Sequence, residues 1–409
     1  MPTSKPAHVL DGYKVLDFTQ ALAGPTVTRL MAELGADIIK VEFPPKGDFS
    51  RAFPFLKDGR SAYFVQQNRG KKSLCLDPKK PEGLAVIKKL LPTMDVLIEN
   101  YSPGTIARMG LGWEEVSKIN PRLIMCSVSG FGQTGPLANR PGYDYIGMSY
   151  AAVTYMIGDP NGPPSFPMLG LGDVSTGVHA LAAIACALLY RDKTGRGQHL
   201  DVSLLDSYFH CHELNVQMYS ASGGKVKPKR AGSHHTAVPI IGIFKGKGPE
   251  SYLFIMAPVD HQFAALCRTM GRPELAADPR FTTVGARAAN LAEITGIIQA
   301  WLDSQPDDAT ILRKLEENRI PVAPILSVEE AVNHPHLRER RTVRKIRDRI
   351  IGEYDIPGVP LRFSDFPTEL DLQAPLLGEH NAEILGRLGY SADRISEMEK
   401  SGVLGRGDR

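Results

Sequence analysis

An aspartate between glycines is the residue of this sequence best suited to covalent chemistry. Asp173 lies within residues 170–177 (GLGDVSTG), directly before an apolar stretch that predicts a helix. A carboxylate at a helix start lies near free backbone N–H groups, which keep it ionised and can stabilise charge that develops on an attacked carbonyl. A simple N-cap is the alternative role, because aspartate is a favoured N-cap residue. The flanking glycines favour a role that needs close approach.

The histidine and cysteine runs do not predict a metal site. Residues 210–213 (HCHE) and the pair His234-His235 are consecutive, so on a helix they point about 100° apart, whereas helical metal pairs are spaced i, i+4. The five cysteines are scattered and unpaired in spacing, which indicates neither disulfides nor zinc. Cys126 falls in an apolar strand, where a buried residue is expected rather than a nucleophile. No G-x-S-x-G motif supports an α/β-hydrolase.

A small-residue loop and several cations indicate an anion site. Residues 19–25 (TQALAGP) place a loop at a helix N-terminus, which favours an anion, although such a loop taken alone more often has an architectural role. The G-x-G-x-x-G spacing is missing, which disfavours a nicotinamide-dependent dehydrogenase. Cations at or near strand ends could together bind the phosphates of a nucleotide-like ligand, although each alone is weak evidence. They are Lys71, Lys72, Lys79, Arg108 and Arg140.

Alternating apolar strands and amphipathic helices predict the α/β class, with a doubly wound parallel sheet. We expect strands at 15–18, 37–42, 73–76, 95–98 and 123–128, with helices at 25–34, 82–91 and 113–119. Residues 176–190 are apolar on almost every side, so they predict a helix that is buried all round, in a core or a subunit interface.

Length and composition predict an ordinary globular protein with more than one domain. The chain has 409 residues, 43% hydrophobic and 23% charged, and a net charge of +3, which is too balanced for a dedicated nucleic-acid binder. Residues 1–8 have no apolar leader region and the longest apolar run, 180–189, is too short to span a bilayer, so a cytoplasmic protein without a membrane anchor is expected. We predict a large domain (1–225), a small domain (226–318) and a returning C-terminal part (319–409).

Ordered motifs along almost the whole chain resemble those of the class III CoA-transferases, the formyl-CoA transferase and carnitine CoA-transferase family. The matching segments are VLDFT (15–19), AGP (23–25), LGADIIKVE (34–42), GD (47–48) with Arg51, ENYSPG (99–104), GD (172–173), KTGRGQ (193–198) and APLLGEH (374–380).

The resemblance implies a fold, a nucleophile and a reaction. The fold is a Rossmann-like large domain without a dinucleotide fingerprint, plus a smaller α+β domain, in an interlocked ring-like dimer. Asp173 is the implied nucleophile, which forms mixed anhydrides and an aspartyl-CoA thioester. No permanently bound cofactor or metal is implied, and coenzyme A and its acyl esters are substrates.

The resemblance also implies binding residues. The CoA contacts carried over are Leu22, Ala23, Leu76, Asp77, Lys79, Asn100, Tyr101, Ser102, Arg108 and Arg140. The substrate contacts suggested are Gln20, Tyr143, His234 and His235. Two departures matter: Phe43 stands where some members have a cation, and the glycine-rich lid of the formyl-CoA enzyme has no clear counterpart, which disfavours oxalate as acceptor.

Two other functions remain open. The first is an α-methylacyl-CoA racemase, which shares the implied fold. Racemases carry a Gly-His-Asp triplet, and Tyr143 stands here in the position of its histidine. A tyrosine of pKa near 10 is a poor base at neutral pH. A CoA-binding subunit of a heteromeric transferase is the second, although the retained Asp173 argues against it. Succinyl-CoA is the hypothetical donor, with an arene-substituted or aliphatic acid as acceptor, in a homodimer or a heterodimer.

Overall fold

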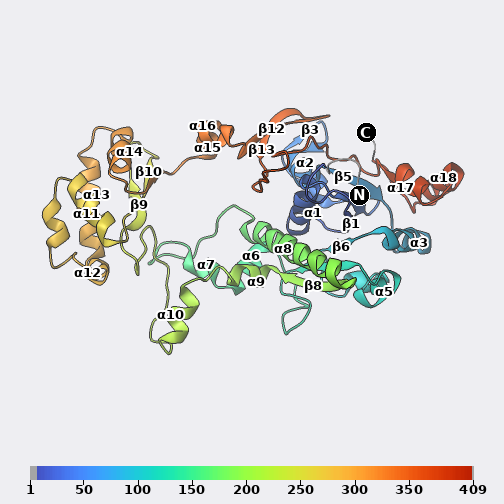
Figure 1. The fold of residues 1–409 in the computed structure, drawn as a ribbon, viewed down its shortest axis with the longest axis horizontal. Coiled ribbons are helices and arrows are strands. Elements are labelled where there is room, and N and C mark those ends of the chain that lie inside the picture. Colours follow the sequence, from blue (N-terminus) through green and yellow to red (C-terminus); the bar gives the residue numbers. More distant parts are fainter. Residues whose placement is uncertain (1–6, 408–409) are drawn as a thin grey trace. The chain divides into compact units, whose positions relative to one another are not determined.

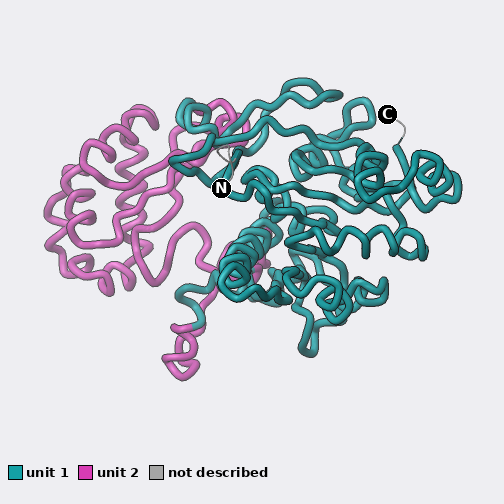
Figure 2. The backbone as a smooth tube through the Cα atoms, turned by 45° about the vertical axis from the view of Figure 1, so that its right-hand side comes forward, with its two compact units in different colours: residues 1–153, 167–216, 335–409 teal, residues 154–166, 217–334 magenta. Residues whose placement is uncertain are grey.

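The computed structural model describes residues 7–407, so most of the N-terminal segment 1–8 considered above lies outside it. The chain forms two compact units, shown in different colours in Figure 2. Unit 1 comprises residues 1–153, 167–216 and 335–409, and unit 2 comprises residues 154–166 and 217–334.

Unit 1 is built around six parallel strands in the order β5-β2-β1-β6-β7-β8 (Figure 1). The bounds are β1 (Lys14–Asp17), β2 (Asp37–Glu42), β5 (Lys71–Cys75), β6 (Val96–Glu99), β7 (Ile124–Ser129) and β8 (Gln198–Ser203). The predicted α/β class with a parallel sheet is therefore confirmed. Strand order reverses at β1, which pairs with both β2 and β6, and ligands of open α/β sheets bind beyond the carboxyl ends of the strands at such a point.

Helices cover both faces of this sheet, because alternate strand residues enter two different cores. Val15 and Val96 pack with Val27 of α1 (Ala23–Glu33) and Ala180 of α8 (Leu171–Thr194). The neighbouring residues of the same strands, Leu16 and Leu97, face the opposite core, which contains side chains of α3 (Pro81–Leu90) and α5 (Trp113–Ile119). Strands with two apolar faces are typical of a parallel sheet between helix layers.

Helix α8 differs from its prediction. It begins at Leu171, so Asp173 lies in its first turn rather than before it. One face of the helix packs in the sheet core, as predicted, whereas Val178 and Leu189 on the other face are 47% and 63% exposed in the single chain, and burial of that face in a subunit interface stays a prediction. Within residues 7–407 it is the one helix long and apolar enough to cross a membrane, which is weak evidence because a core helix meets the same criterion.

Unit 2 has its own sheet and core. The antiparallel sheet has the order β11-β10-β9, with β9 (Ile241–Lys245), β10 (Tyr252–Met256) and β11 (Val322–Pro324). Its helices are α11 (Asp260–Thr269), α12 (Val284–Ala289), α13 (Leu291–Asp303), α14 (Asp308–Glu317) and α15 (Val328–Asn333). Residues 319–334 belong here and not to the returning C-terminal part, because β11 pairs with β10; residues 154–166 also belong to unit 2.

The remaining elements are short. They are β3 (Leu56–Lys57), β4 (Arg60–Ser61), α2 (Ala62–Asn68), α4 (Thr105–Arg108), α6 (Asp144–Tyr150), α7 (Val153–Met156), α9 (Leu204–Phe209), α10 (Asn215–Ala221), α16 (Pro335–Glu339), β12 (Val343–Asp348), β13 (Gly352–Pro357), α17 (Asn381–Arg387) and α18 (Ala392–Lys400). Three 3₁₀ turns, Phe49–Ala52, Leu91–Thr93 and Pro273–Ala277, complete the set in the described residues.

A buried ion pair ties the C-terminal segment to the first third of unit 1. The Arg60 guanidinium contacts Asp348 of β12 at 2.8 Å, and both side chains are almost completely buried. Arg60 also donates to the carbonyls of Ala374 and Pro375. Arg60 thus contacts both the hairpin β12–β13 and the segment after it.

We predict that Asp348→Asn lowers the free energy of unfolding by about 3–5 kcal/mol, because it leaves the Arg60 charge buried without its partner. Asp355→Asn on the same hairpin is the matched control. Asp355 pairs with Arg338 at a partly exposed position, where an ion pair contributes about 0–1 kcal/mol to the free energy of unfolding. Urea unfolding of both variants at equal concentration measures the difference. Equal losses would contradict this account of Arg60.

Candidate active site

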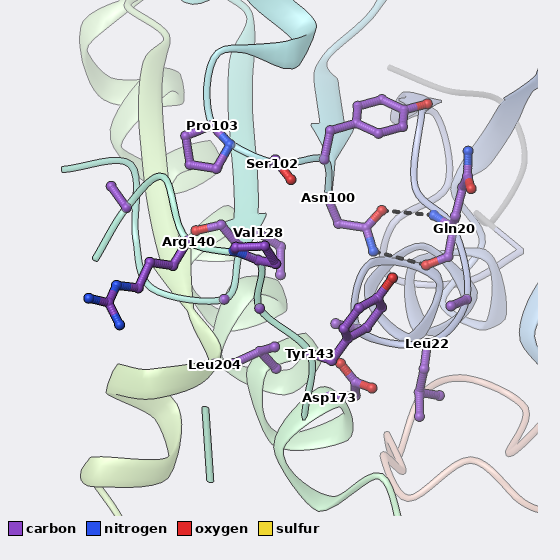
Figure 3. Close-up of a pocket in the computed structure, with 18 of the residues that line it drawn as sticks. Gln20, Leu22, Asn100, Ser102, Pro103, Val128, Arg140, Tyr143, Asp173 and Leu204 are labelled. Carbon is purple, nitrogen blue, oxygen red and sulfur yellow. Dashed lines mark hydrogen bonds between the residues drawn. The ribbon is translucent and has the colours of Figure 1, made fainter. Parts of the chain in front are cut away.

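A cavity of about 310 Å³ lies at the carboxyl edge of the unit 1 sheet, where β1, β6 and β7 end (Figure 3). The loop after β1, the loop after β6, the segment 138–143 and the first turn of α8 supply its walls. Of the predicted site residues, those that line it are Gln20, Leu22, Ala23, Asn100, Tyr101, Ser102, Arg140, Tyr143 and Asp173. This is the sheet edge at which the strand order predicts a ligand.

The Asp173 carboxylate is held where ionisation is disfavoured. Burial, and next the negative charge of Asp144, raise the pKa of Asp173 to about 7. Backbone N–H groups were predicted to favour the charged form of Asp173, but the shift of its pKa is upward. A carboxyl group with a raised pKa in a cleft is typical of a catalytic position. Figure 3 shows Tyr143 beside Asp173, with the Arg140 guanidinium directed away from both.

The loop after β1 is fixed by an amide from the next strand. Asn100 accepts from the Gln20 backbone N–H at 2.8 Å and donates to the Gln20 carbonyl at 2.9 Å (Figure 3). Ala21 adopts a left-handed φ of 63°, and its N–H points to Asp48 Oδ1 at 3.3 Å. Strained residues of this kind occur where the surroundings over-determine the backbone, which is common at ligand sites.

Buried ion pairs lie beneath this loop. Lys40 pairs with Asp48 at 2.9 Å and donates to the Thr19 carbonyl at 2.6 Å. Although burial opposes its ionisation, the Lys40 ammonium lowers the pKa of Asp48 to about 2. Lys71 pairs with Asp17 at 3.0 Å with both side chains fully buried, and burial lowers the pKa of Lys71 to about 8.

Two of the cations expected to bind phosphate, Lys71 and Lys72, instead form ion pairs within the chain. Lys71 is buried in the ion-pair network. Lys72 pairs with Asp37 at 2.9 Å, and both residues lie at the amino-terminal ends of their strands. The prediction that they form part of a phosphate site is wrong, because a strand alternates its side chains and its two ends face opposite edges of the sheet.

Four other predicted CoA contacts lie outside the cavity. Leu76 is buried and bridges to Leu404, and the Asp77 N–H donates to the Val403 carbonyl. Lys79 is exposed, and its backbone N–H donates to Asp77. Arg108 is exposed and donates to the Thr105 hydroxyl. All four follow β5 or β6, so they share the carboxyl edge of the sheet with the cavity.

The histidines have local partners. His234 and His235 belong to unit 2: the His234 ring packs edge-on against Phe244, and His235 Nδ1 accepts from the Val238 N–H. In the run 210–213, His212 contacts the Ala151 carbonyl. Across residues 7–407, no three His, Cys, Asp or Glu side chains gather as metal ligands would.

Several residues at the site were not predicted. Phe49 lines the cavity, and Tyr63 lies close enough that burial and the Asp173 charge raise its pKa. Asp144 is buried and accepts a short hydrogen bond from Tyr208. Phe49 directly follows the matched Gly47-Asp48 motif, which could have indicated it, whereas Tyr208 carries no local signal.

Comparison with known proteins identifies the family. The model of the CoA-transferase family III matches residues 10–381. The chain is 35% identical over 398 residues to the succinyl-CoA:glutarate CoA-transferase of Mus musculus, covering 97% of this chain and 90% of that one. It is 35% identical over 415 residues to the formyl-CoA:oxalate CoA-transferase of Escherichia coli O6:H1, covering 97% and 99%.

A solved structure agrees. A CAIB/BAIF family protein from Brucella suis has a TM-score of 0.81 and 35% identity, covering 93% of this chain and 100% of that one. The chain belongs to CoA-transferase family III, and the resemblance stated from the sequence is confirmed. It is thus a CoA-transferase enzyme of acyl-CoA metabolism, with CoA esters as substrates.

We predict that Asn100→Ala raises the KM for the CoA ester about tenfold, since a loop that loses two hydrogen bonds, each worth about 1 kcal/mol, no longer holds its shape. Asn120→Ala is the control, because the Asn120 side chain also bonds backbone groups away from the cavity: it donates to the Leu91 and Met94 carbonyls and accepts from the Arg122 N–H. Steady-state kinetics measures both. A wild-type KM in Asn100→Ala would contradict the role given to the loop.

Proposed function

We propose that this CoA-transferase moves CoA from an acyl-CoA donor to a carboxylic acid through covalent intermediates on Asp173. The observation that carries the proposal is that Asp173 is the acidic residue that lines the cavity, at the helix start and sheet edge where the family motifs converge. Its raised pKa indicates a basic carboxylate when ionised, as a nucleophile requires.

The reaction is written as four acyl exchanges. An Asp173 carboxylate oxygen attacks the thioester carbonyl carbon of the donor, the C–S bond breaks, and CoA thiolate and a mixed anhydride form. The thiolate attacks the Asp173 carboxyl carbon, which releases the donor acid and leaves an aspartyl-CoA thioester. The acceptor carboxylate then displaces the thiolate to give a second anhydride. Attack of the thiolate on the acceptor carbonyl releases the new CoA ester and restores Asp173.

The surroundings of Asp173 suit these exchanges. Every step passes between activated acyl groups, so the site must exclude water and stabilise oxyanions rather than supply a strong driving force. Leu22, Phe49 and Leu204 line the cavity, which favours exclusion of water. The Asn100 and Ser102 side chains and the exposed cations Lys79, Arg108 and Arg140 lie at the same edge, where we assign the CoA chain and its phosphates.

We further propose succinyl-CoA as donor. Relatives named for succinyl-CoA:glutarate transfer and succinate–glutarate transfer are 35% and 36% identical to this chain. The formyl-CoA:oxalate enzyme is equally similar, but its glycine-rich lid has no clear counterpart in this sequence, which disfavours oxalate as acceptor. Tyr143, where racemases have a histidine, favours transfer over racemisation.

A homodimer is the proposed assembly. The exposed side of α8 carries large apolar side chains, and β8 is an edge strand of the sheet. The exposed apolar residues on this helix are Leu171, Val174, Val178, Leu189 and Tyr190. Apolar surface gathered on one helix face is typical of an interface, and the resemblance implies two interlocked chains.

Light scattering on the purified chain is therefore expected to give twice the chain mass of 44.7 kDa. The mass should not change on dilution into the nanomolar range, because interlocked chains separate only when they unfold. A mass of one chain, with full transfer activity, would contradict the homodimer. Activity that appears only after a related subunit is added would instead indicate a heteromeric transferase.

A panel of acyl-CoA donors against carboxylic acids tests the function directly. Succinyl-CoA is expected to support transfer, and Asp173→Asn is expected to keep its fold and lose at least about 10³-fold in kcat, because an amide is not nucleophilic. Asp192→Asn, an exposed substitution on the same helix, serves as control and should keep wild-type kcat.

Separate outcomes would refute separate parts of the proposal. Wild-type turnover in Asp173→Asn would refute the covalent mechanism. Transfer from other donors but not from succinyl-CoA would refute the donor alone. Exchange of the α-hydrogen with deuterated solvent, without transfer, would indicate a racemase.

A further inference from the structure

A tyrosine from α9 lies between the nucleophile's helix and a second carboxylate. Tyr208 is 4% exposed. Its hydroxyl donates a hydrogen bond to Asp144 Oδ1, and, although burial raises the pKa of Tyr208, the nearby backbone N–H of Gly172 opposes that rise. Asp144 begins α6 and Gly172 directly precedes Asp173, so one hydroxyl connects α6, α8 and α9 next to the reacting group.

The glycine before Asp173 is explained by this contact. A Cβ atom on Gly172 would overlap the Tyr208 ring and would lie 2.5 Å from Asp144 Oδ1. A side chain at this position would therefore push away both members of the pair. The close approach that the sequence pattern around Asp173 predicted is thus an approach by Tyr208 and Asp144.

We propose that Tyr208 is a positioning residue of the transfer reaction, which acts on Asp173 by holding Asp144 and the Gly172 backbone in place. Asp144 depends on this hydroxyl, because its other oxygen, Oδ2, is buried without a hydrogen-bond partner. The Tyr208 hydroxyl therefore fixes the position of the Asp144 carboxylate beside Asp173.

The Asp144 charge in turn makes Asp173 a stronger nucleophile. The titratable groups of the described residues that face Asp173 come from three helices and the residue before one of them. They are Asp144 at the start of α6, Tyr143 directly before Asp144, Tyr63 on α2 and Tyr208 on α9. After burial, Asp144 is the group that raises the pKa of Asp173. Since nucleophilicity rises with basicity, a charged neighbour increases the reactivity of ionised Asp173 at the cost of ionising it only at higher pH.

The test is the pH profile of Tyr208→Phe, and it rests on the proposed role of Asp173. In the wild type, kcat/KM should fall as pH falls below about 7, because the free enzyme loses its carboxylate as Asp173 takes up a proton. In Tyr208→Phe, the Asp144 carboxylate loses the hydroxyl that holds it near Asp173, so its effect on the pKa of Asp173 weakens and the acidic limb of the profile moves to lower pH. The kcat at high pH should fall about threefold to tenfold with an unchanged KM for the CoA ester.

A second variant and a control keep the test decisive. Asp144→Asn removes the carboxylate charge without touching the tyrosine and should shift the acidic limb in the same direction, which also covers a Tyr208→Phe protein that fails to fold. Tyr219→Phe, at a half-exposed position on α10, should leave the profile unchanged.

Two results would overturn the inference: an acidic limb at the wild-type pH in Tyr208→Phe, or one at the wild-type pH in Asp144→Asn. A purely structural role of Tyr208 would lower the melting temperature without moving the limb. Failure of the proposed function is distinguishable, because Asp173→Asn would then retain turnover whatever Tyr208→Phe does.

Discussion

Charges buried at the carboxyl edge of the parallel sheet are the constraint on which the site depends. Lys40 joins Asp48 to the Thr19 carbonyl, and Asp48 in turn meets the Ala21 N–H. The loop after β1 can therefore adopt the left-handed turn at Ala21 that carries Leu22 into the cavity. Because breaking a buried pair leaves an uncompensated charge, these residues cannot be replaced singly without disturbing the loop.

On the other side of the cavity, Asp173 lacks a cation as partner. It is buried near a second carboxylate, that of Asp144, and both effects raise the pKa of Asp173 to about 7. The two sides are complementary: a network of ion pairs shapes the loop after β1, and the proposed nucleophile Asp173 lies opposite it. The glycines at 170 and 172 allow Leu22, Asp144 and Tyr208 to approach the turn that bears it.

Local patterns predicted the strands and helices of unit 1 well, because strands such as β2 and helices such as α3 are bounded by their own turn residues and by their apolar periodicity. Nine of the residues that line the cavity, Asp173 among them, were also predictable. Tyr208 and Tyr63 were not, because they reach the site from distant segments through tertiary packing. The predicted role of Lys71 was wrong for the same reason, since its partner Asp17 is brought to it by the pairing of three strands.

In the proposed reaction, an oxygen of Asp173 becomes bonded to an acyl group. Mass spectrometry of peptides from enzyme mixed with succinyl-CoA and quenched in acid within one turnover detects this bond. The peptide containing Asp173 is expected to gain the mass of CoA or of the donor acyl group, and the Asp173→Asn peptide is expected to gain neither. Transfer at full rate with an unmodified Asp173 peptide at every time point would contradict the proposed reaction.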